Sequence, residues 1–329
     1  MSDDPSAERR PGPPVTETAV MLDPMSERPG ARFVRRVRRH WYWARTEGFG
    51  RLIEEDDLHP LARAWAGAQR YRWRRAHPIE AGTAVPVFLV GLQRSGTNML
   101  TRALAASREF EVYNENDRRA FERFRLRPDG DIERLVETCR SRYVLFKPLC
   151  DSHRTGELLD RFGGGGPRAV WMFRSVEGRI ASAVAKFGDV NLRVLAAIAA
   201  GEGDHTWQAQ GISSENRDLL RRFDYDAMSA ESAAALFWYI RHSLFFDLGL
   251  DRRDDATIVS WDGLVAQPDV GMRSLCAFLG LAFQPALFAH FEHRTRVGGQ
   301  RADIDPVIRE RCEALHQRLE GAARAAVGG

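Results

Sequence analysis

The stretch from residue 85 to residue 107 constrains the fold most, because its pattern predicts a buried strand, a loop and a helix in immediate succession. Residues 85–90 form a continuous apolar run with three valines, which is typical of a parallel strand buried on both faces. A helix is predicted to begin near Thr97, since apolar residues then recur at helical spacing, namely Met99, Leu100, Ala103 and Leu104. Its free N–H groups and positive dipole end would face the loop, so the stretch predicts an anion-binding site.

The loop itself is bounded by Gly91 and Gly96, a spacing that resembles the start of a Walker A loop. Walker A continues with a lysine that reaches the phosphates and a hydroxyl that binds Mg²⁺, but Thr97 and Asn98 stand at those positions. A cation, Arg94, lies inside the loop instead. The loop is therefore predicted to hold a phosphate without the usual metal. The alternative interpretation is a glycine-bearing turn between strand and helix that binds nothing.

The rest of the chain alternates between strand and helix patterns. Strands are predicted at 110–113, 143–146, 169–173 and 257–261, and helices at 118–127, 131–140, 157–162, 176–184, 236–248, 272–279 and 305–326, the last of them polar. This alternation predicts an α/β fold with a parallel sheet flanked by helices, in which ligands bind at the carboxyl ends of the strands. Four charged residues lie at or just beyond predicted strand ends: Arg94, Glu115, Lys147 and Arg174.

The order of these motifs over residues 85–295 resembles the sulfotransferase superfamily, whose fold is P-loop-like and whose donor is 3′-phosphoadenosine 5′-phosphosulfate (PAPS). Gly-x-x-Arg-Ser-Gly-Thr after the first strand is similar to its 5′-phosphosulfate loop. The pair Arg174 and Ser182 is similar to its 3′-phosphate motif. The segment from Trp261 onward is similar to its late Tyr-Glu-Asp-Leu segment, with Trp261 in place of the tyrosine and Asp262 in place of the glutamate. The layout is closer to the bacterial and tyrosylprotein-type branch than to the cytosolic branch.

This resemblance implies that a sulfuryl group moves from PAPS to an acceptor hydroxyl. Glu115 would be the base, with Asp117 and His153 as alternatives, and Lys147 and Arg94 would stabilise the departing phosphate oxygen without a metal ion. The resemblance also implies the residues that hold the donor: Arg94, Ser95, Gly96, Thr97, Asn98, Arg174, Ser182, Trp261, Arg296 and Gly298.

Composition limits the class of protein. With 44% apolar and 28% charged residues the chain is typical of a soluble globular protein, and a formal net charge of +3 is too small to indicate a nucleic-acid partner. The four cysteines, at 139, 150, 276 and 312, show no close pairing, so neither a zinc site nor a disulfide framework is indicated. No apolar run reaches the roughly 18 to 20 residues of a membrane span. We therefore expect a cytoplasmic protein.

Three regions are predicted along the chain. Residues 1–30 are rich in proline and polar residues and are predicted to be a disordered tail. Residues 31–80 are basic and aromatic and are predicted to form a helical arm packed on the catalytic domain, which comprises residues 81–329. The alternative for the arm is a peripheral contact with an anionic membrane surface or a polyanionic substrate.

Two other functions remain open from the sequence: a P-loop phosphotransferase, and a catalytically silent protein that binds a nucleotide or a membrane surface. Within the sulfotransferase interpretation, no motif selects among carbohydrate, lipid, small-alcohol and peptide acceptors. The acceptor pocket is expected from residues 116–142 and 188–228.

Overall fold

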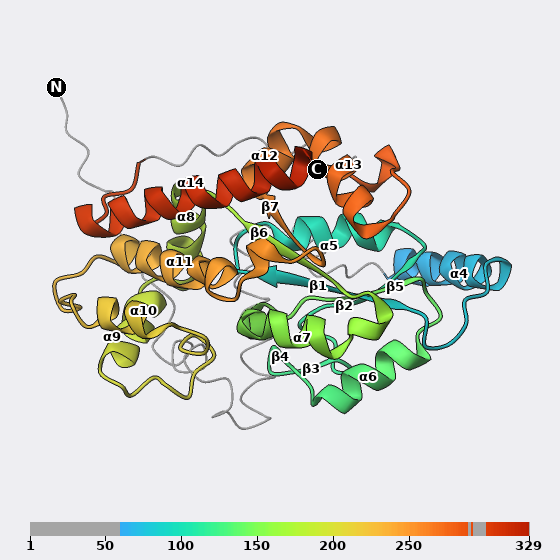
Figure 1. Ribbon diagram of the computed structural model, residues 1–329, viewed down its shortest axis with the longest axis horizontal. Coiled ribbons are helices and arrows are strands. Elements are labelled where there is room, and N and C mark those ends of the chain that lie inside the picture. The colour runs from blue at the N-terminus through green and yellow to red at the C-terminus, as the bar shows by residue number, and fades with distance from the viewer. Residues whose placement is uncertain (1–59, 289–290, 292–300, 329) are drawn as a thin grey trace.

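The computed structural model describes residues 60–288, 291 and 301–328. Its centre is a five-stranded parallel sheet with the strand order β2-β5-β1-β6-β7 (Figure 1). All five predicted strands are confirmed within a residue or two, and the fold is the expected α/β architecture. The strands are β1 (Val85–Gly91), β2 (Phe110–Tyr113), β5 (Tyr143–Phe146), β6 (Arg168–Phe173) and β7 (Ala256–Ser260).

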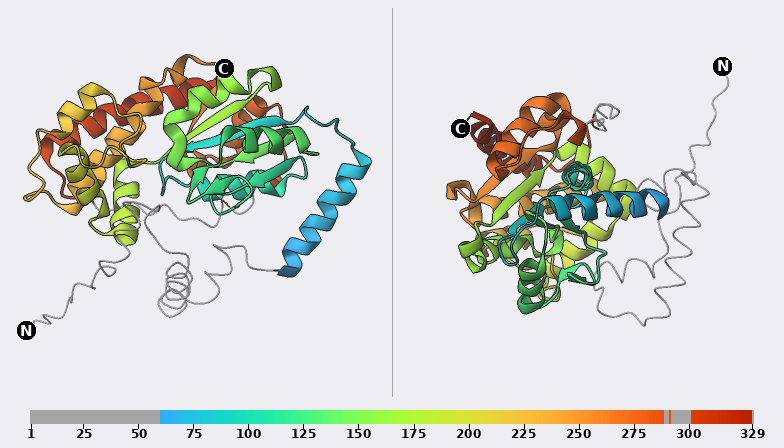
Figure 2. Two further views of the ribbon diagram at one scale, coloured as in Figure 1. Left: turned by 90° about the horizontal axis from the view of Figure 1, so that it is seen from below. Right: turned by 90° about the vertical axis from the view of Figure 1, so that its right-hand side faces the viewer.

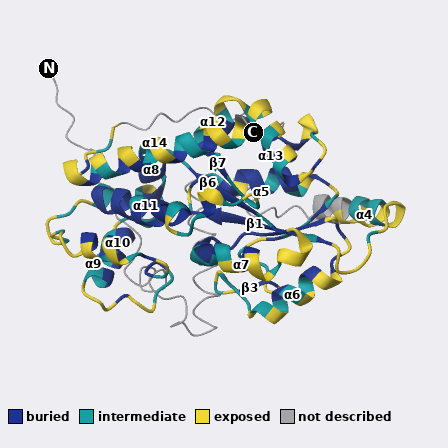
Figure 3. Cartoon of the chain, in the orientation of Figure 1, coloured by how far each residue is buried: buried dark blue, intermediate teal, exposed yellow. Residues whose placement is uncertain are grey.

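Both faces of the sheet are buried, which explains why β1 reads as an uninterrupted apolar run. Side chains alternate along a strand, so Val87 and Leu89 pack on one face while Phe88 and Val90 pack on the other. The first face is covered by α5 (Thr97–Ala106), α12 (Trp261–Ala266) and α13 (Pro268–Leu279). The second is covered by α6 (Asp129–Thr138), α7 (Thr155–Arg161), α8 (Val176–Phe187) and α11 (Ala230–Asp247). Figure 3 shows the buried sheet between the partly exposed helices.

The hairpin after β2 corrects the sequence prediction. Residues 118–127 were predicted to be helical, but they contain the antiparallel strands β3 (Phe121–Glu122) and β4 (Arg125–Leu126). Arg123 and Phe124 have φ angles of 51° and 68°, which a right-handed helix does not allow. The distant Asp151 holds the hairpin, because its carboxylate accepts from Arg125 Nε at 2.5 Å and from the Leu126 N–H at 2.7 Å.

The last helix also differs from its prediction. It was predicted to be polar, but α14 (Pro306–Gly328) buries an apolar stripe at helical spacing and packs along α11 (Figure 1). The buried residues are Ile308, Cys312, Leu315, Leu319 and Ala323. They are separated by polar residues in the sequence, so the polar majority of the segment concealed the stripe.

Several short elements had no prediction, because segments of three to ten residues span too few turns to show a clear periodicity. They are the helices α9 (Val190–Ala199) and α10 (Ser214–Leu220), and the 3₁₀ turns η1 (Leu149–Arg154), η2 (Gly163–Gly165), η3 (Leu250–Arg252) and η4 (Pro285–Leu287). The start of the helix predicted at 131–140 is also corrected, since α6 begins two residues earlier, at Asp129.

Only the end of the predicted basic arm is described, as α4 (Pro60–Ala76), which extends from the side of the domain (Figure 2). Its contacts with the domain are polar: Arg70 donates to the Ala105 carbonyl at 2.5 Å, and Arg74 pairs with Glu111 at 3.2 Å. Tyr71 is 62% exposed. The predicted tail and residues 31–59 of the arm lie outside the described residues. Among the described helices, none is both long and apolar enough to span a membrane.

Candidate active site

The loop between β1 and α5 requires its two glycines. Gly91 has a φ of 119°, and a Cβ atom there would lie 2.3 Å from the Met172 carbonyl oxygen. Gly96 has a φ of 85°, and a Cβ atom there would lie 1.7 Å from Cδ1 of Trp261. The serine of η1 holds the first end of the loop, since the Gly91 N–H donates to Ser152 Oγ at 3.0 Å and Ser152 Oγ donates to the Gly91 carbonyl at 2.9 Å. Sequence reasoning did not identify Ser152.

Arg94 lies inside this loop in the left-handed region, with a φ of 71°. A non-glycine residue in that region costs about 1–2 kcal/mol, so the rest of the loop holds this conformation against its own preference. The side chain is exposed, and its Nε donates to Ser182 Oγ on α8 at 2.8 Å. Two residues that the sequence assigned to donor binding are thus in direct contact, although they lie 88 positions apart.

Ser95 and Thr97 complete the loop and are buried. The Ser95 hydroxyl has no hydrogen-bond partner among the described residues. A buried hydroxyl without a partner is costly, and here it lies where the N-terminus of α5 already favours an anion. Both features fit a loop that receives a phosphate or sulfate group.

Lys147, at the end of β5, joins residues from two other elements. Its ammonium group donates to Asn98 Oδ1 at 2.6 Å and lies 3.7 Å from Glu115 Oε1. Lys147 is 5% exposed, so its charge is held in a poorly solvated position. The first turn of α5 and the ends of β2 and β5 therefore bring together the predicted base, one predicted stabilising cation and one predicted donor-binding residue.

The three candidate bases differ in their electrostatics. Burial raises the pKa of Glu115 above its usual value, although the charge of Lys147 lowers it in part. Burial would also raise the pKa of Asp117, but hydrogen bonds from Arg119 outweigh it and the pKa is lowered. Burial and the neighbouring cations Arg241 and Arg125 lower the pKa of His153 to about 3. A stronger base has a higher pKa, so Glu115 is the most basic of the three.

Arg174 and Trp261 form a second contact between predicted residues. The Arg174 guanidinium carbon lies 4.0 Å from the centroid of the Trp261 ring. Gly178 leaves the room for it, since a Cβ atom there would lie 2.6 Å from Arg174 Nε. The Ser175 N–H donates to Asp262 Oδ2 at 2.7 Å, which ties the end of β6 to the start of α12. The Trp261 ring thus lies between Gly96 of the loop and Arg174, which is predicted to bind the 3′-phosphate.

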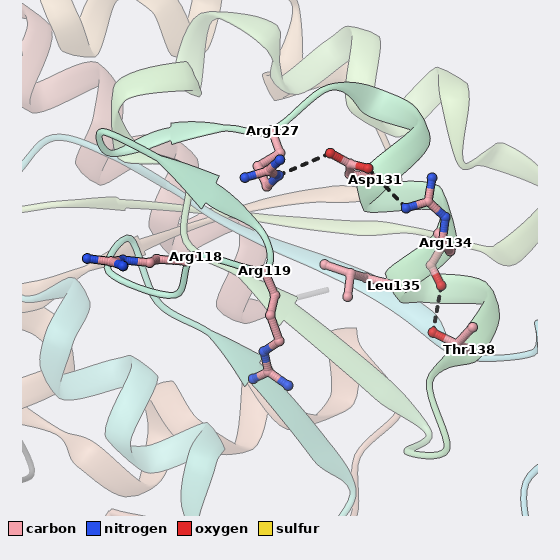
Figure 4. Close-up of a pocket in the computed structure, with 7 residues that line it drawn as sticks. All are labelled: Arg118, Arg119, Arg127, Asp131, Arg134, Leu135 and Thr138. Carbon is pink, nitrogen blue, oxygen red and sulfur yellow. Dashed lines mark hydrogen bonds and ion pairs between the residues drawn. The ribbon is translucent and has the colours of Figure 1, made fainter. Parts of the chain in front are cut away.

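A cavity of about 340 Å³ is lined by residues of the segment 116–142, where the acceptor pocket was expected (Figure 4). Four arginines and one aspartate give its lining a formal charge of +3. Asp131 is bound on both sides, by Arg127 at 3.0 Å and Arg134 at 3.1 Å. The cavity is lined by Arg118, Arg119, Arg127, Asp131, Arg134, Leu135 and Thr138.

Two predicted donor residues, Arg296 and Gly298, lie outside the described residues, as does the glycine-bearing loop that contains them. Within the described part of the chain, no group of three or more His, Cys, Asp or Glu side chains is placed to hold a metal ion.

Three solved structures illustrate what the chain is similar to, and all are sulfotransferases. The sulfotransferase from Alicyclobacillus acidocaldarius has a TM-score of 0.42 and 15% identity, covering 74% of this chain and 95% of that chain. The sulfotransferase domain of the Synechococcus PCC 7002 olefin synthase has a TM-score of 0.40 and 16% identity, covering 71% and 95%. The sulfotransferase domain from the curacin biosynthetic pathway has a TM-score of 0.37 and 14% identity, covering 73% and 91%.

No family model matches the chain, and no curated protein matches it. At TM-scores of 0.42 and below, the function has to be argued from the site residues themselves.

Proposed function

We propose that this protein is a PAPS-dependent sulfotransferase that acts on an acceptor hydroxyl. The observation that carries the proposal is the contact of Lys147 with both Glu115 and Asn98 at the carboxyl edge of the sheet, beside a loop that contains Arg94. Such a group supplies one base and two cations around an anion-binding loop. That is what transfer of a sulfuryl group to a hydroxyl requires.

In this mechanism Glu115 takes the proton of the acceptor hydroxyl while the acceptor oxygen forms its bond to sulfur. The bond between sulfur and the phosphate oxygen breaks, and the electron pair stays on that oxygen. Lys147 and Arg94 stabilise the negative charge that develops there, together with the N–H groups of Ser95, Gly96 and Thr97. Arg174 and Ser182 bind the 3′-phosphate, and Trp261 borders the adenine side of the donor. We assign Arg296 and Gly298 to the donor as well.

A P-loop phosphotransferase is less well supported because of Asn98. This residue stands where a Walker loop places the hydroxyl that binds Mg²⁺. Its side-chain oxygen accepts a hydrogen bond from Lys147 at 2.6 Å, so a protein cation lies where the metal would be needed. A sulfuryl group carries less negative charge than a phosphoryl group, and protein cations alone can stabilise its transfer.

The acceptor is proposed to enter beside Glu115, with part of it in the arginine-lined cavity. Arg118 follows Glu115 by three residues, so their Cα atoms are at most about 11 Å apart. Arg119 is paired with Asp117 at 2.7 Å, but the other three arginines of the lining still outnumber its one aspartate, and this excess of positive charge favours an acceptor that carries an anionic group besides its hydroxyl. We place the protein in the bacterial cytoplasm, which is compatible with four free, buried cysteines.

The test has two parts. Calorimetry with adenosine 3′,5′-bisphosphate and adenosine 5′-phosphate asks whether the donor site exists, and a clear preference for the bisphosphate is expected. Incubation of host extracts with PAPS and the protein, followed by mass spectrometry, then asks which acceptor gains a sulfuryl group. No preference for the bisphosphate would contradict the donor assignment. Tight binding without any sulfated product would favour the catalytically silent alternative.

A further inference from the structure

Arg179 is a buried charge that the proposed reaction does not use. It lies on α8 and is 1% exposed. An arginine guanidinium stays protonated at neutral pH, so a full positive charge is enclosed here. Its Nη1 donates to the Ala234 carbonyl at 2.9 Å, its guanidinium carbon lies 5.5 Å from the centroid of the Phe237 ring, and its Nε has no hydrogen-bond partner.

No ion pair joins Arg179 to a carboxylate in the part of the chain that the structure describes. The neighbouring Glu177 is bound to Arg309 at 3.3 Å. Burial and, to a smaller extent, the positive charge of Arg94 together lower the pKa of Arg179 to about 9. The nearby His242 is also buried, and burial lowers its pKa, so it is a neutral neighbour that offers Arg179 no negative charge. A buried cation that faces another cation is unfavourable unless an anion arrives.

Arg241, the other arginine that is buried among the described residues, is a useful comparison. It is 2% exposed, but its Nη1 donates to the carbonyls of Gln210 at 2.9 Å, Gln208 at 3.3 Å and Trp207 at 3.5 Å. Burial lowers the pKa of Arg241 to about 10, and the negative charge of Asp151 opposes that shift in part. Nη2 of Arg241 also lacks a hydrogen-bond partner, but the three contacts of its Nη1 tie the segment 207–210 to α11, whereas Arg179 has a single carbonyl partner. Arg179 is not explained in this way.

The position of Arg179 indicates which anion would compensate its charge. Arg179 and Ser182 are three residues apart on α8, so they share one face of the helix. Ser182 contacts Arg94, and it is the residue proposed to bind the 3′-phosphate of the donor. We propose that Arg179 is a positioning residue that supplies buried positive charge to this site, so that Ser182 and its neighbours select a phosphate dianion. The inference rests on the proposed donor site.

A neutral substitution of similar length, Arg179→Met, separates this role from a structural one. Removing an uncompensated buried charge should not lower the free energy of unfolding. The Ala234 carbonyl keeps its backbone hydrogen bond within α11. We expect the melting temperature of the free protein to stay unchanged or to rise. The dissociation constant for adenosine 3′,5′-bisphosphate should rise roughly tenfold, while that for adenosine 5′-phosphate stays within about twofold.

Two further variants complete the experiment. Arg179→Lys keeps the charge and should retain most of the affinity for the bisphosphate. Arg241→Met is the matched control: it should lower the melting temperature and leave the ratio of the two nucleotide affinities unchanged. Melting temperatures with and without each nucleotide, and calorimetry on the folded variants, measure all of these effects.

The outcomes distinguish the inference from the proposed function. If wild type prefers the bisphosphate and Arg179→Met preserves that preference, only the role of Arg179 is wrong. An Arg179→Met variant that is strongly destabilised or does not fold also overturns the inference, because the charge would then be needed by the fold itself. If wild type has no preference for the bisphosphate, the donor site fails and the inference fails with it.

Discussion

The two sides of the candidate site are built in different ways. The donor side consists of turns between strand and helix, at 91–97, 174–176 and 260–262, where the sheet fixes each residue within a short stretch of chain. The acceptor side consists of a hairpin and a short helix, and its position depends on contacts such as that of Arg125 with Asp151 at 2.5 Å. The donor side is therefore anchored at the strand ends of the main sheet and fixed further by contacts such as that of Ser152 with Gly91, whereas the acceptor side lies outside that sheet, which predicts different responses to substitution.

The largest effect is expected where the two sides meet. Glu115→Gln and Lys147→Ala should each lower turnover by about 10²- to 10⁴-fold, since one removes the base and the other a cation at the breaking bond. Affinity for adenosine 3′,5′-bisphosphate should stay within about tenfold of wild type. Steady-state kinetics and calorimetry check both values. Near wild-type turnover of Glu115→Gln would move the base assignment to Asp117 or His153.

On the donor side, Arg174→Ala should act on binding and not on the fold. A charge-assisted contact to phosphate contributes about 1.5–3 kcal/mol, so the bisphosphate should bind roughly ten- to more than a hundredfold more weakly. Affinity for adenosine 5′-phosphate should hardly change. Equal losses for the two nucleotides in calorimetry would mean that Arg174 does not recognise the 3′-phosphate.

A pair of glycines tests how closely the donor loop is packed. Gly96 and Gly82 have similar φ angles of 85° and 81°, but only Gly96 faces a neighbour, Trp261, within 4 Å. Gly82→Ala should cost about 1–2 kcal/mol for the left-handed backbone alone. Gly96→Ala should cost about 2 kcal/mol more and weaken nucleotide binding, because the indole must move. Denaturant unfolding measures the difference. Equal losses in the free energy of unfolding would show that the Trp261 side chain can move aside at no cost.

The pH dependence follows from the raised pKa of Glu115. The base acts when deprotonated, so activity should fall as the pH falls through a value above the usual 4.5, by up to about tenfold per pH unit. The free energy of unfolding should change in the opposite direction and rise as the pH falls through this value. The raised pKa contributes stability at low pH that is lost as the pH rises through the folded-state value. A pH profile of kcat/KM whose acidic limb is not raised above 4.5 would contradict this assignment.

The smallest effect is expected at the rim of the acceptor side. Arg118→Gln should raise KM about two- to fivefold for an acceptor with an anionic group and leave a neutral acceptor unchanged, as an exposed ion pair contributes little. The effect should fade with added salt. Arg252→Gln serves as the control. Arg252 is also an exposed arginine, but it lies near the start of β7, the edge strand opposite to β2, and so away from the cavity. Equal effects on both acceptors would argue against an anion in the cavity.

The difference between the two sides also explains where sequence reasoning failed. Residues 118–127 carry a plausible helical pattern, but the carboxylate of Asp151 stabilises a hairpin and offsets the cost of the positive φ angles of Arg123 and Phe124 at its turn. Neither cause is visible locally, because Asp151 lies 25 residues from Leu126. The same holds for Arg179, whose place on the buried face of α8 reads in the sequence as an interruption of the apolar pattern.

The sequence by itself determined the five strands, the glycine-bounded loop between β1 and α5 and the set of charged residues at the carboxyl edge of the sheet. These features arise within short stretches, where strand pattern, glycine and helix start follow one another. Only the tertiary structure decided the strand order, the contact of Lys147 with Asn98 and Glu115, the arginine-lined cavity and the enclosed charge of Arg179. Each of these depends on which distant segments are packed together, and burial, which shifts the pKa of Glu115 and isolates Arg179, exists only after that packing has formed.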